Sequence, residues 1–147
     1  MRATFLPFSK PSLQEWEIKA VEDVLRSGWI TTGPKNAEFE QKFCEYVGAS
    51  HAVPMTSETA VMFALLRAID LKPGDEVVSP SMTWVSLPNA VSLFGARVSF
   101  ADCDRDTLMS TPEMLEAAVT PRTKLIVPVH FAGSVVELDR LRAFAER

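Results

Sequence analysis

Residues 49–147 alternate between short apolar segments and amphipathic segments, and this alternation constrains the fold more than any other feature of the sequence. Apolar segments typical of strands lie at Glu76–Pro80, Val98–Ala101 and Leu125–Val129, and a short segment at His51–Met55 predicts a further strand. Segments with helical spacing lie between and after them, at Thr59–Asp70, Leu87–Phe94, Thr111–Val119 and Val136–Arg147. Strands that alternate with helices are typical of a three-layer αβα domain, in which right-handed crossovers join parallel strands.

Two amphipathic helices are expected before this domain. Ser12 and Glu15 have the spacing of a capping box, in which each side chain binds a free backbone N–H of the first turn. Gly28 then supplies the left-handed residue that ends many helices. Asn36 is expected to cap the second helix, which Gly48 ends. The apolar faces consist of Leu13, Trp16, Ala20, Val21 and Val24 in the first helix and Phe39, Phe43 and Val47 in the second.

The composition excludes several classes of protein. The 147 residues are 47% hydrophobic and 23% charged, which is typical of about one globular domain and not of a disordered, collagen-like or disulfide-framed chain. A net charge of −4 provides no broad positive surface for nucleic acid. The longest apolar run, Ala60–Leu66, is far shorter than the roughly 18 residues of a membrane helix, and the N-terminus lacks a signal-peptide core. We therefore expect a cytoplasmic protein that neither binds nucleic acid nor inserts into a membrane.

The sequence predicts no metal site. Cys44 and Cys103 form no CxxC pair and, with only two histidines in the chain, match no zinc spacing, so reduced thiols are expected. Asp102, Asp104 and Asp106 follow a predicted strand, but the glycine and the distal glutamate of a calcium loop are missing. A turn stabilised by aspartate side chains is the better interpretation.

Ligands of open α/β sheets bind beyond the carboxyl ends of the strands, where helix N-termini present free N–H groups. Three segments are expected there, namely Met55–Ala60, Ser79–Ser86 and Pro128–Gly133. The first segment can hold a phosphate, or it can form an ordinary N-cap with Glu58 in the first turn. The sequence contains neither a GxGxxG motif nor a Walker lysine loop, which argues against those two modes of nucleotide binding.

Two large side chains in these segments have two open interpretations each. Trp84 either offers a flat face to a planar ring or fills a gap in the core. His130 either contacts a ligand or caps backbone groups at the sheet edge.

Five segments together resemble, in the same order, the DegT/DnrJ-type sugar aminotransferases. They are Gly28–Asn36, Ser57–Ala60, Gly74–Ser86, Asp102–Met109 and Pro128–Gly133. The resemblance covers essentially the whole chain, and several long blocks in register make it more specific than any single motif. Within the family, it is strongest to the UDP-4-amino-4-deoxy-L-arabinose–oxoglutarate aminotransferases of lipid A modification and polymyxin resistance.

The resemblance implies a homodimeric enzyme of the aspartate aminotransferase fold that uses pyridoxal 5′-phosphate. Such an enzyme takes an amino group from glutamate, which becomes 2-oxoglutarate, and delivers it to a nucleotide sugar, here a UDP-4-keto-pentose. The resemblance places the cofactor phosphate at Ser57, Glu58 and Thr59, and the pyridine ring against Trp84. It assigns to the nucleotide-sugar pocket the residues Thr32, Gly33, Lys35 and His130.

Two departures from the family pattern bear on this expectation. The family usually has a small residue where this chain has Glu58, and a carboxylate beside a phosphate dianion is repulsive. In relatives, the Schiff-base lysine and the aspartate that pairs with the pyridine nitrogen come later than the equivalent of Arg147, and none of the six lysines here matches. No catalytic residue is therefore expected in this chain. We expect the N-terminal part of the enzyme, inactive alone, with a helical arm at about 1–48 and an incomplete large domain at about 49–147.

Three alternatives remain open at this point. The chain is an inert remnant or binding module of the same family, a relative that uses pyridoxamine phosphate for sugar dehydration, or an unrelated flavodoxin-like domain.

Overall fold

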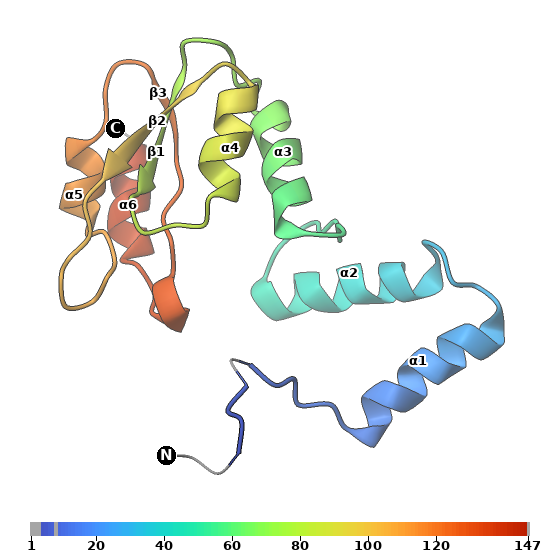
Figure 1. Cartoon of the computed structure of the whole chain (residues 1–147). Coiled ribbons are helices and arrows are strands. Elements are labelled where there is room, and N and C mark those ends of the chain that lie inside the picture. The colour runs from blue at the N-terminus through green and yellow to red at the C-terminus, as the bar shows by residue number, and fades with distance from the viewer. Residues whose placement is uncertain (1–3, 8, 147) are drawn as a thin grey trace. The chain divides into compact units, whose positions relative to one another are not determined.

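The computed structural model describes residues 4–7 and 9–146, and the chain divides into two units after Pro54 (Figure 1). The first unit contains α1 (Glu15–Ser27) and α2 (Pro34–Val47). The second unit begins at Met55 and contains a parallel sheet with its covering helices.

Helix α1 ends as predicted but begins two residues later than a Ser12 cap would place it. Gly28 adopts a left-handed conformation (φ 73°) after the last turn, which confirms the expected stop. At the other end, the Glu17 carboxylate accepts a hydrogen bond from the Gln14 N–H at 2.5 Å. The Ser12 prediction is therefore wrong. Both residue pairs have the three-residue spacing of a capping box, and spacing alone does not select between them.

Helix α2 also ends at its predicted glycine, Gly48 (φ 70°), and begins earlier than predicted. Gly33 occupies the N-cap position and Pro34 the first helical position, where its missing N–H has no consequence. Asn36 is therefore not the cap. It lies in the first turn, and its Oδ1 accepts the Gly33 N–H at 3.2 Å. Among the described residues of the first unit, none is buried.

The second unit has three layers (Figure 1). Its sheet has the order β2-β1-β3, and both neighbours run parallel to the central strand. Side chains of α3 and α4 pack on one face, and those of α5 and α6 pack on the other. This arrangement confirms the predicted αβα fold class. The elements are α3 (Glu58–Ala68), β1 (Glu76–Pro80), α4 (Ser86–Leu93), β2 (Arg97–Ala101), α5 (Pro112–Ala117), β3 (Thr123–Ile126), a 3₁₀ turn (Phe131–Gly133) and α6 (Leu138–Ala145).

The central strand β1 joins the two halves of the core. Its five residues are all buried, because a central parallel strand is covered on both faces. Val77 packs into the cluster beneath α3 and α4, and Val78 packs into the cluster beneath α5 and α6. Successive side chains of a strand point to opposite faces, so two adjacent valines anchor two separate layers.

A buried carboxylate fixes the amino end of β1. Glu76 is only 6% exposed, and it accepts hydrogen bonds from Thr120 Oγ1 at 2.5 Å and from Arg122 Nε at 2.8 Å. The Thr120 hydroxyl and then the Arg122 guanidinium hold the pKa of Glu76 below its usual value. The ionised carboxylate therefore links β1 to the segment that precedes β3.

One predicted strand is absent from the described structure, and two predicted elements have other bounds. Residues 51–55 form no strand, because none of the described residues pairs with them, and strand structure requires a hydrogen-bonded neighbour. Strand β3 spans Thr123–Ile126 and not Leu125–Val129, although the Val127 N–H still donates to the Val78 carbonyl at 2.9 Å. Helix α6 begins at Leu138 and not at Val136. The predicted end of that helix, Arg147, lies outside the described residues.

Candidate functional site

The second unit brings three of the sequence-predicted segments to one edge. Strand β1 ends at Pro80 and β3 ends at Ile126, and α3 and α4 begin at this same end of the unit (Figure 1). Ser86, the first residue of α4, donates from Oγ to the Met62 Sδ of α3 at 3.4 Å. This contact joins the first residue of α4 to the second turn of α3. Val85, and not Ser86, occupies the N-cap position of α4, and it makes no side-chain capping bond.

The start of α3 has two unused backbone donors. Ser57 is the N-cap, and its Oγ accepts the Ala60 N–H at 3.2 Å, while its carbonyl accepts the Val61 N–H at 3.1 Å. The N–H groups of Glu58 and Thr59 have no acceptor among the residues that the structure describes. Both residues are exposed. The N-cap interpretation of Ser57 is thus correct, and it leaves two amides directed out of the helix, where an anion is favourable.

Glu58 places a negative charge at this helix start. Its side chain is exposed, and within the described part of the chain it forms no ion pair. In the absence of a ligand, a carboxylate in the first turn is favourable beside the helix dipole. The same charge opposes a second anion at the two free amides.

Trp84 does not fill a gap in the core. It lies two residues before α4, and it is 72% exposed. The buried interpretation is therefore wrong, and the ring has a face free for a planar partner. Trp84 thus lies close in sequence to the start of α4, whose first residue contacts α3.

His130 follows β3 by four residues and is exposed. Its Nδ1 accepts the Val136 N–H at 3.2 Å. The backbone-capping interpretation is therefore correct. It does not exclude a ligand, because the second ring nitrogen makes no hydrogen bond with another described residue.

Thr32, Gly33 and Lys35 belong to the first unit: Thr32 lies in the turn between α1 and α2, Gly33 is the N-cap of α2, and Lys35 lies in the first turn of α2. The Trp29 indole closes this turn by donating from Nε1 to the Thr32 carbonyl at 3.0 Å. Gly33 packs against the same ring, and a Cβ at this position would lie 2.7 Å from the indole Cδ1. The turn therefore requires glycine for space and not for its backbone angle, which is extended.

Lys35 already has a partner. Its Nζ binds Glu38 at 2.7 Å, and Lys42 binds the other oxygen of the same carboxylate at 2.7 Å. Lys35 first, and then Lys42, lower the pKa of Glu38 to about 2. All three side chains are largely solvated. Lys35 can therefore exchange this partner for a ligand anion at little cost, because exposed ion pairs contribute little.

The aspartate-rich segment after β2 forms a turn. Asp104 Oδ1 accepts the N–H groups of Asp106 and Thr107, at 3.2 and 2.8 Å, and the Thr107 hydroxyl at 2.8 Å. These bonds, led by those from Thr107, lower the pKa of Asp104. The interpretation as an aspartate-stabilised turn is correct.

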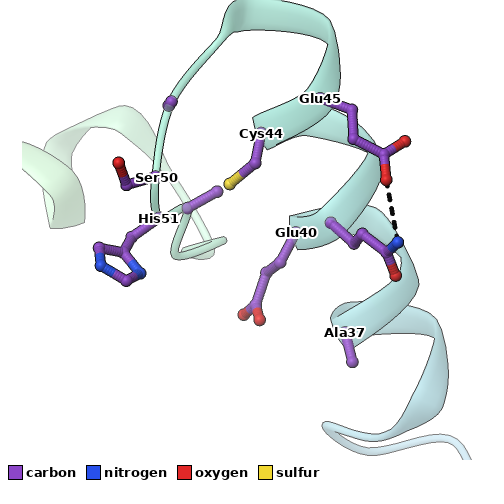
Figure 2. A pocket seen from close by; sticks show the side chains of 9 residues that line it. Ala37, Glu40, Cys44, Glu45, Ser50 and His51 are labelled. Atoms are coloured by element: carbon purple, nitrogen blue, oxygen red, sulfur yellow. Dashed lines mark hydrogen bonds between the residues drawn. The ribbon is translucent and has the colours of Figure 1, made fainter.

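The first unit also contains a hollow with a volume of about 460 Å³, which no predicted site residue lines (Figure 2). Its lining includes four residues of α2, namely Glu40, Gln41, Cys44 and Glu45, and also His51. Gln41 Nε2 donates to Glu45 Oε1 at 2.9 Å. The sequence contains one signal for this hollow: α2 carries polar residues four positions apart, and the helix ends at Gly48. No group of three metal-binding side chains forms there or elsewhere among the described residues.

The lysines of the second unit lie at the opposite edge of the sheet. Lys72 binds Asp70 at 2.7 Å, and Lys124 Nζ binds the Asp70 carbonyl at 2.7 Å. Asp70 follows the C-terminal end of α3. The edge with the free amides and the exposed tryptophan can therefore bind an anion and a planar ring, but neither of these lysines lies at that edge.

No helix in the described part of the chain is long and apolar enough to cross a membrane.

The chain resembles known proteins along nearly its whole length. A sequence model of the DegT/DnrJ/EryC1/StrS aminotransferase family matches residues 11–147. Spr1654 from Streptococcus pneumoniae, which is assigned as a sugar aminotransferase, is 41% identical, with a TM-score of 0.86 over 94% of this chain and 35% of that one. It has been solved in forms with pyridoxal phosphate, with pyridoxamine phosphate and without either.

Two further solved structures agree. An aminotransferase from Psychrobacter cryohalolentis is 36% identical, with a TM-score of 0.85 over 95% of this chain and 36% of that chain. A 3-amino-5-hydroxybenzoic acid synthase is 34% identical, with a TM-score of 0.84 over 94% of this chain and 36% of that one. This chain thus spans about a third of the length of these relatives. From the family match and these identities, we conclude that the chain belongs to the DegT/DnrJ/EryC1/StrS aminotransferase family.

Proposed function

We propose that this chain provides the phosphate-binding and ring-binding part of a pyridoxal 5′-phosphate site, in an aminotransferase that acts on a nucleotide sugar. The observation that carries the proposal is the common edge at which two free amides and an exposed tryptophan lie, at the starts of two helices in contact. Family membership supports it, as do the two cofactor forms of Spr1654.

The start of α3 fits a phosphate in number and kind of donor. The N–H groups of Glu58 and Thr59 are free, and the hydroxyl proton of Ser57 is not used in its own cap, where Oγ is the acceptor. Three donors at a helix N-terminus are a favourable site for a dianion. The Glu58 carboxylate is the one group that opposes it, and we expect this side chain to point away from the phosphate when the site is filled.

The exposed Trp84 fits the aromatic ring of the cofactor. A tryptophan that is 72% exposed gains contact area when a planar ring covers it. Because Trp84 contributes little to the core, a planar ligand can cover its exposed face without disturbing the packing of the fold.

A bound cofactor would supply an electron sink for the amino-transfer reaction. This chain's own residues orient it: the α3 amides hold the phosphate, and Trp84 fixes the plane of the ring. His130, with a free Nε2, can donate a hydrogen bond to an oxygen of the substrate. The group that moves the proton must come from outside these residues, because Lys72 and Lys124 lie at the other edge.

The substrate that we propose is a UDP-4-keto-pentose, with glutamate as the amino donor and a homodimer as the working form. The sequence blocks shared with the UDP-4-amino-4-deoxy-L-arabinose aminotransferases support this choice, and with it a role in lipid A modification. The glycine-dependent turn at Thr32 and Gly33 supports a pocket for the nucleotide sugar, because a backbone held by an indole can present its amides in a fixed orientation.

A second candidate is favoured by the position of the lysines. A binding module, or a sugar dehydratase that uses pyridoxamine phosphate, needs the phosphate and ring contacts but not an amino-transfer lysine at the same edge. Neither lysine of the second unit lies there.

Product analysis distinguishes these candidates. The protein, purified at its natural length, is incubated with glutamate, the cofactor and a UDP-4-keto-pentose. We expect equal amounts of 2-oxoglutarate and the 4-amino sugar nucleotide, and no turnover above the free-cofactor rate with residues 1–147 alone. A dehydrated sugar would support the dehydratase. Cofactor binding without any product would support the binding module, and neither binding nor product would overturn the proposal.

A further inference from the structure

His130 is fixed by the backbone of the segment that follows it. The Val136 N–H donates to its Nδ1 at 3.2 Å, across a five-residue loop. Val136 is only 6% exposed and belongs to the core cluster beneath α5 and α6. The imidazole is therefore connected to the core through a single hydrogen bond, while the rest of the ring is exposed.

The direction of this hydrogen bond determines the tautomer of the neutral ring. Because Val136 is the donor, Nδ1 must carry a lone pair, and the ring proton must be on Nε2. In the imidazolium form both nitrogens carry protons, and Nδ1 can no longer accept. The contact then places two donors against each other, and it cannot survive protonation.

The loop that this bond closes has an unfavourable backbone. Ala132 has φ 52° and Gly133 has φ 83°, two successive residues in the left-handed region. A non-glycine residue rarely adopts this conformation without support from its surroundings. Within the loop, the Gly133 N–H donates to the His130 carbonyl at 3.2 Å and the Ser134 N–H donates to the Phe131 carbonyl at 3.0 Å.

We propose that the Val136 amide positions His130 as a hydrogen-bond donor at the carboxyl edge of the sheet, and that protonation of His130 releases loop 130–136. At neutral pH the ring presents Nε2–H to whatever occupies this edge. At acid pH the bond is lost, and both the loop and the orientation of the ring become free.

The charged groups near this loop interact with partners other than His130. Glu137 follows Val136 and binds Arg140 at 3.3 Å, and Arg140 also pairs with Glu113 of α5. Asp104, on the turn after β2, lines the same hollow as Val136 and Glu137, and its carboxylate already accepts three hydrogen bonds. None of these groups is within hydrogen-bond distance of the His130 ring.

Asparagine and alanine test the acceptor directly. Asparagine carries an acceptor at the position of Nδ1 that does not titrate, whereas alanine removes it. In the natural-length protein without ligand, we expect parent and H130N to melt above H130A at pH 8. At pH 5 the advantage of the parent over H130A should disappear, and that of H130N should persist. An advantage of the parent that is equal at both pH values overturns the proposal, as does the absence of any difference among the three proteins.

Nitrogen NMR of the two histidines provides an independent test. His51, the only other histidine, is exposed and makes no described hydrogen bond, so it serves as an internal reference with mixed tautomers. We expect His130 to be the Nε2–H form when neutral. We also expect the exchange of the Val136 amide, corrected for the intrinsic rate, to be roughly fivefold faster at pH 5 than at pH 8 in the parent but not in H130N. An Nδ1–H tautomer, or equal protection at both pH values, contradicts the proposal.

The donor role rests on the proposed function, but neither test requires cofactor or substrate. If both tests succeed and the natural-length H130N enzyme has an unchanged KM for the nucleotide sugar, the tautomer assignment stands and the contact with substrate fails. If the tests fail while amino transfer is observed, the proposed function stands and this inference falls.

Discussion

At the scale of single residues, Trp84 is the most informative side chain because its exposure distinguishes a ligand contact from a core residue. The W84A substitution should weaken cofactor binding by roughly 0.5–1.5 kcal/mol beyond the loss of contact area. The melting temperature of the protein without cofactor should change little, since the ring is 72% exposed. Titration of the natural-length protein with pyridoxamine phosphate measures the first effect, and W84F is the control that keeps an aromatic face. Equal affinity in W84A and the parent would exclude stacking.

Glu58 should act in the opposite direction. E58Q removes a negative charge at the two free amides of α3 and keeps the size of the side chain. Two unit charges about 4 Å apart in water repel by about 1 kcal/mol, so we expect cofactor binding to tighten by about fivefold at low salt and by less at high salt. Calorimetry at two ionic strengths measures this. Weaker binding in E58Q would show that the carboxylate supports the phosphate loop.

At the scale of the elements, Glu76 links β1 to the start of β3 as an ionised group. Its pKa is lowered in the folded protein, so its stabilisation is present above the usual glutamate value near 4.5 and is lost as the pH falls through the lower folded-state value. We expect the free energy of unfolding to fall more steeply below pH 4.5 in the parent than in E76Q. The exposed E58Q variant is the matched control. Parallel pH curves for parent and E76Q would contradict the role assigned to this carboxylate.

The turn between α1 and α2 offers a second prediction at this scale. G33A places a methyl group 2.7 Å from the Trp29 Cδ1 position, although the extended backbone at Gly33 permits alanine. We expect the indole to be displaced and its bond to the Thr32 carbonyl to break, with a red shift in the Trp29 fluorescence of a protein in which Trp16 and Trp84 are phenylalanine. T31A, outside this contact, should leave the spectrum unchanged. An unchanged spectrum in G33A would mean that the ring is not held as described.

Local sequence signals predicted which elements form better than they predicted the residues at which those elements begin and end. Strand β1 was predicted at its observed residues, and Gly28 and Gly48 end their helices, because burial and left-handed glycines are properties that a short segment carries itself. Residues 51–55 failed as a strand because strand structure needs a partner far away in the sequence. The segment pattern placed Ser57 and His130 correctly at the sheet edge, whereas the exposure of Trp84 depends on what packs around it, and the sequence left it open.

At the scale of the whole molecule, the first unit has a large apolar surface and, among its described residues, none that is buried. Trp16, Val21 and Leu25 of α1 are each more than 60% exposed. Exposed apolar area of this kind drives association. We therefore expect residues 1–147 to associate with increasing concentration and to melt with low cooperativity, and L25K to reduce the association. A monomer with one sharp transition and broad amide protection would contradict this prediction.

The central claim is that the free amides at the start of α3 hold the phosphate of the cofactor. The most direct measurement records the Glu58 and Thr59 amide resonances of the nitrogen-15-labelled, natural-length protein as pyridoxamine phosphate is added, and again with pyridoxamine, which lacks the phosphate. We predict that both resonances shift with the phosphorylated compound and that the dephosphorylated one causes much smaller shifts at equal concentration. Resonances that stay in place at saturating pyridoxamine phosphate, or that shift equally with both compounds, would contradict the claim.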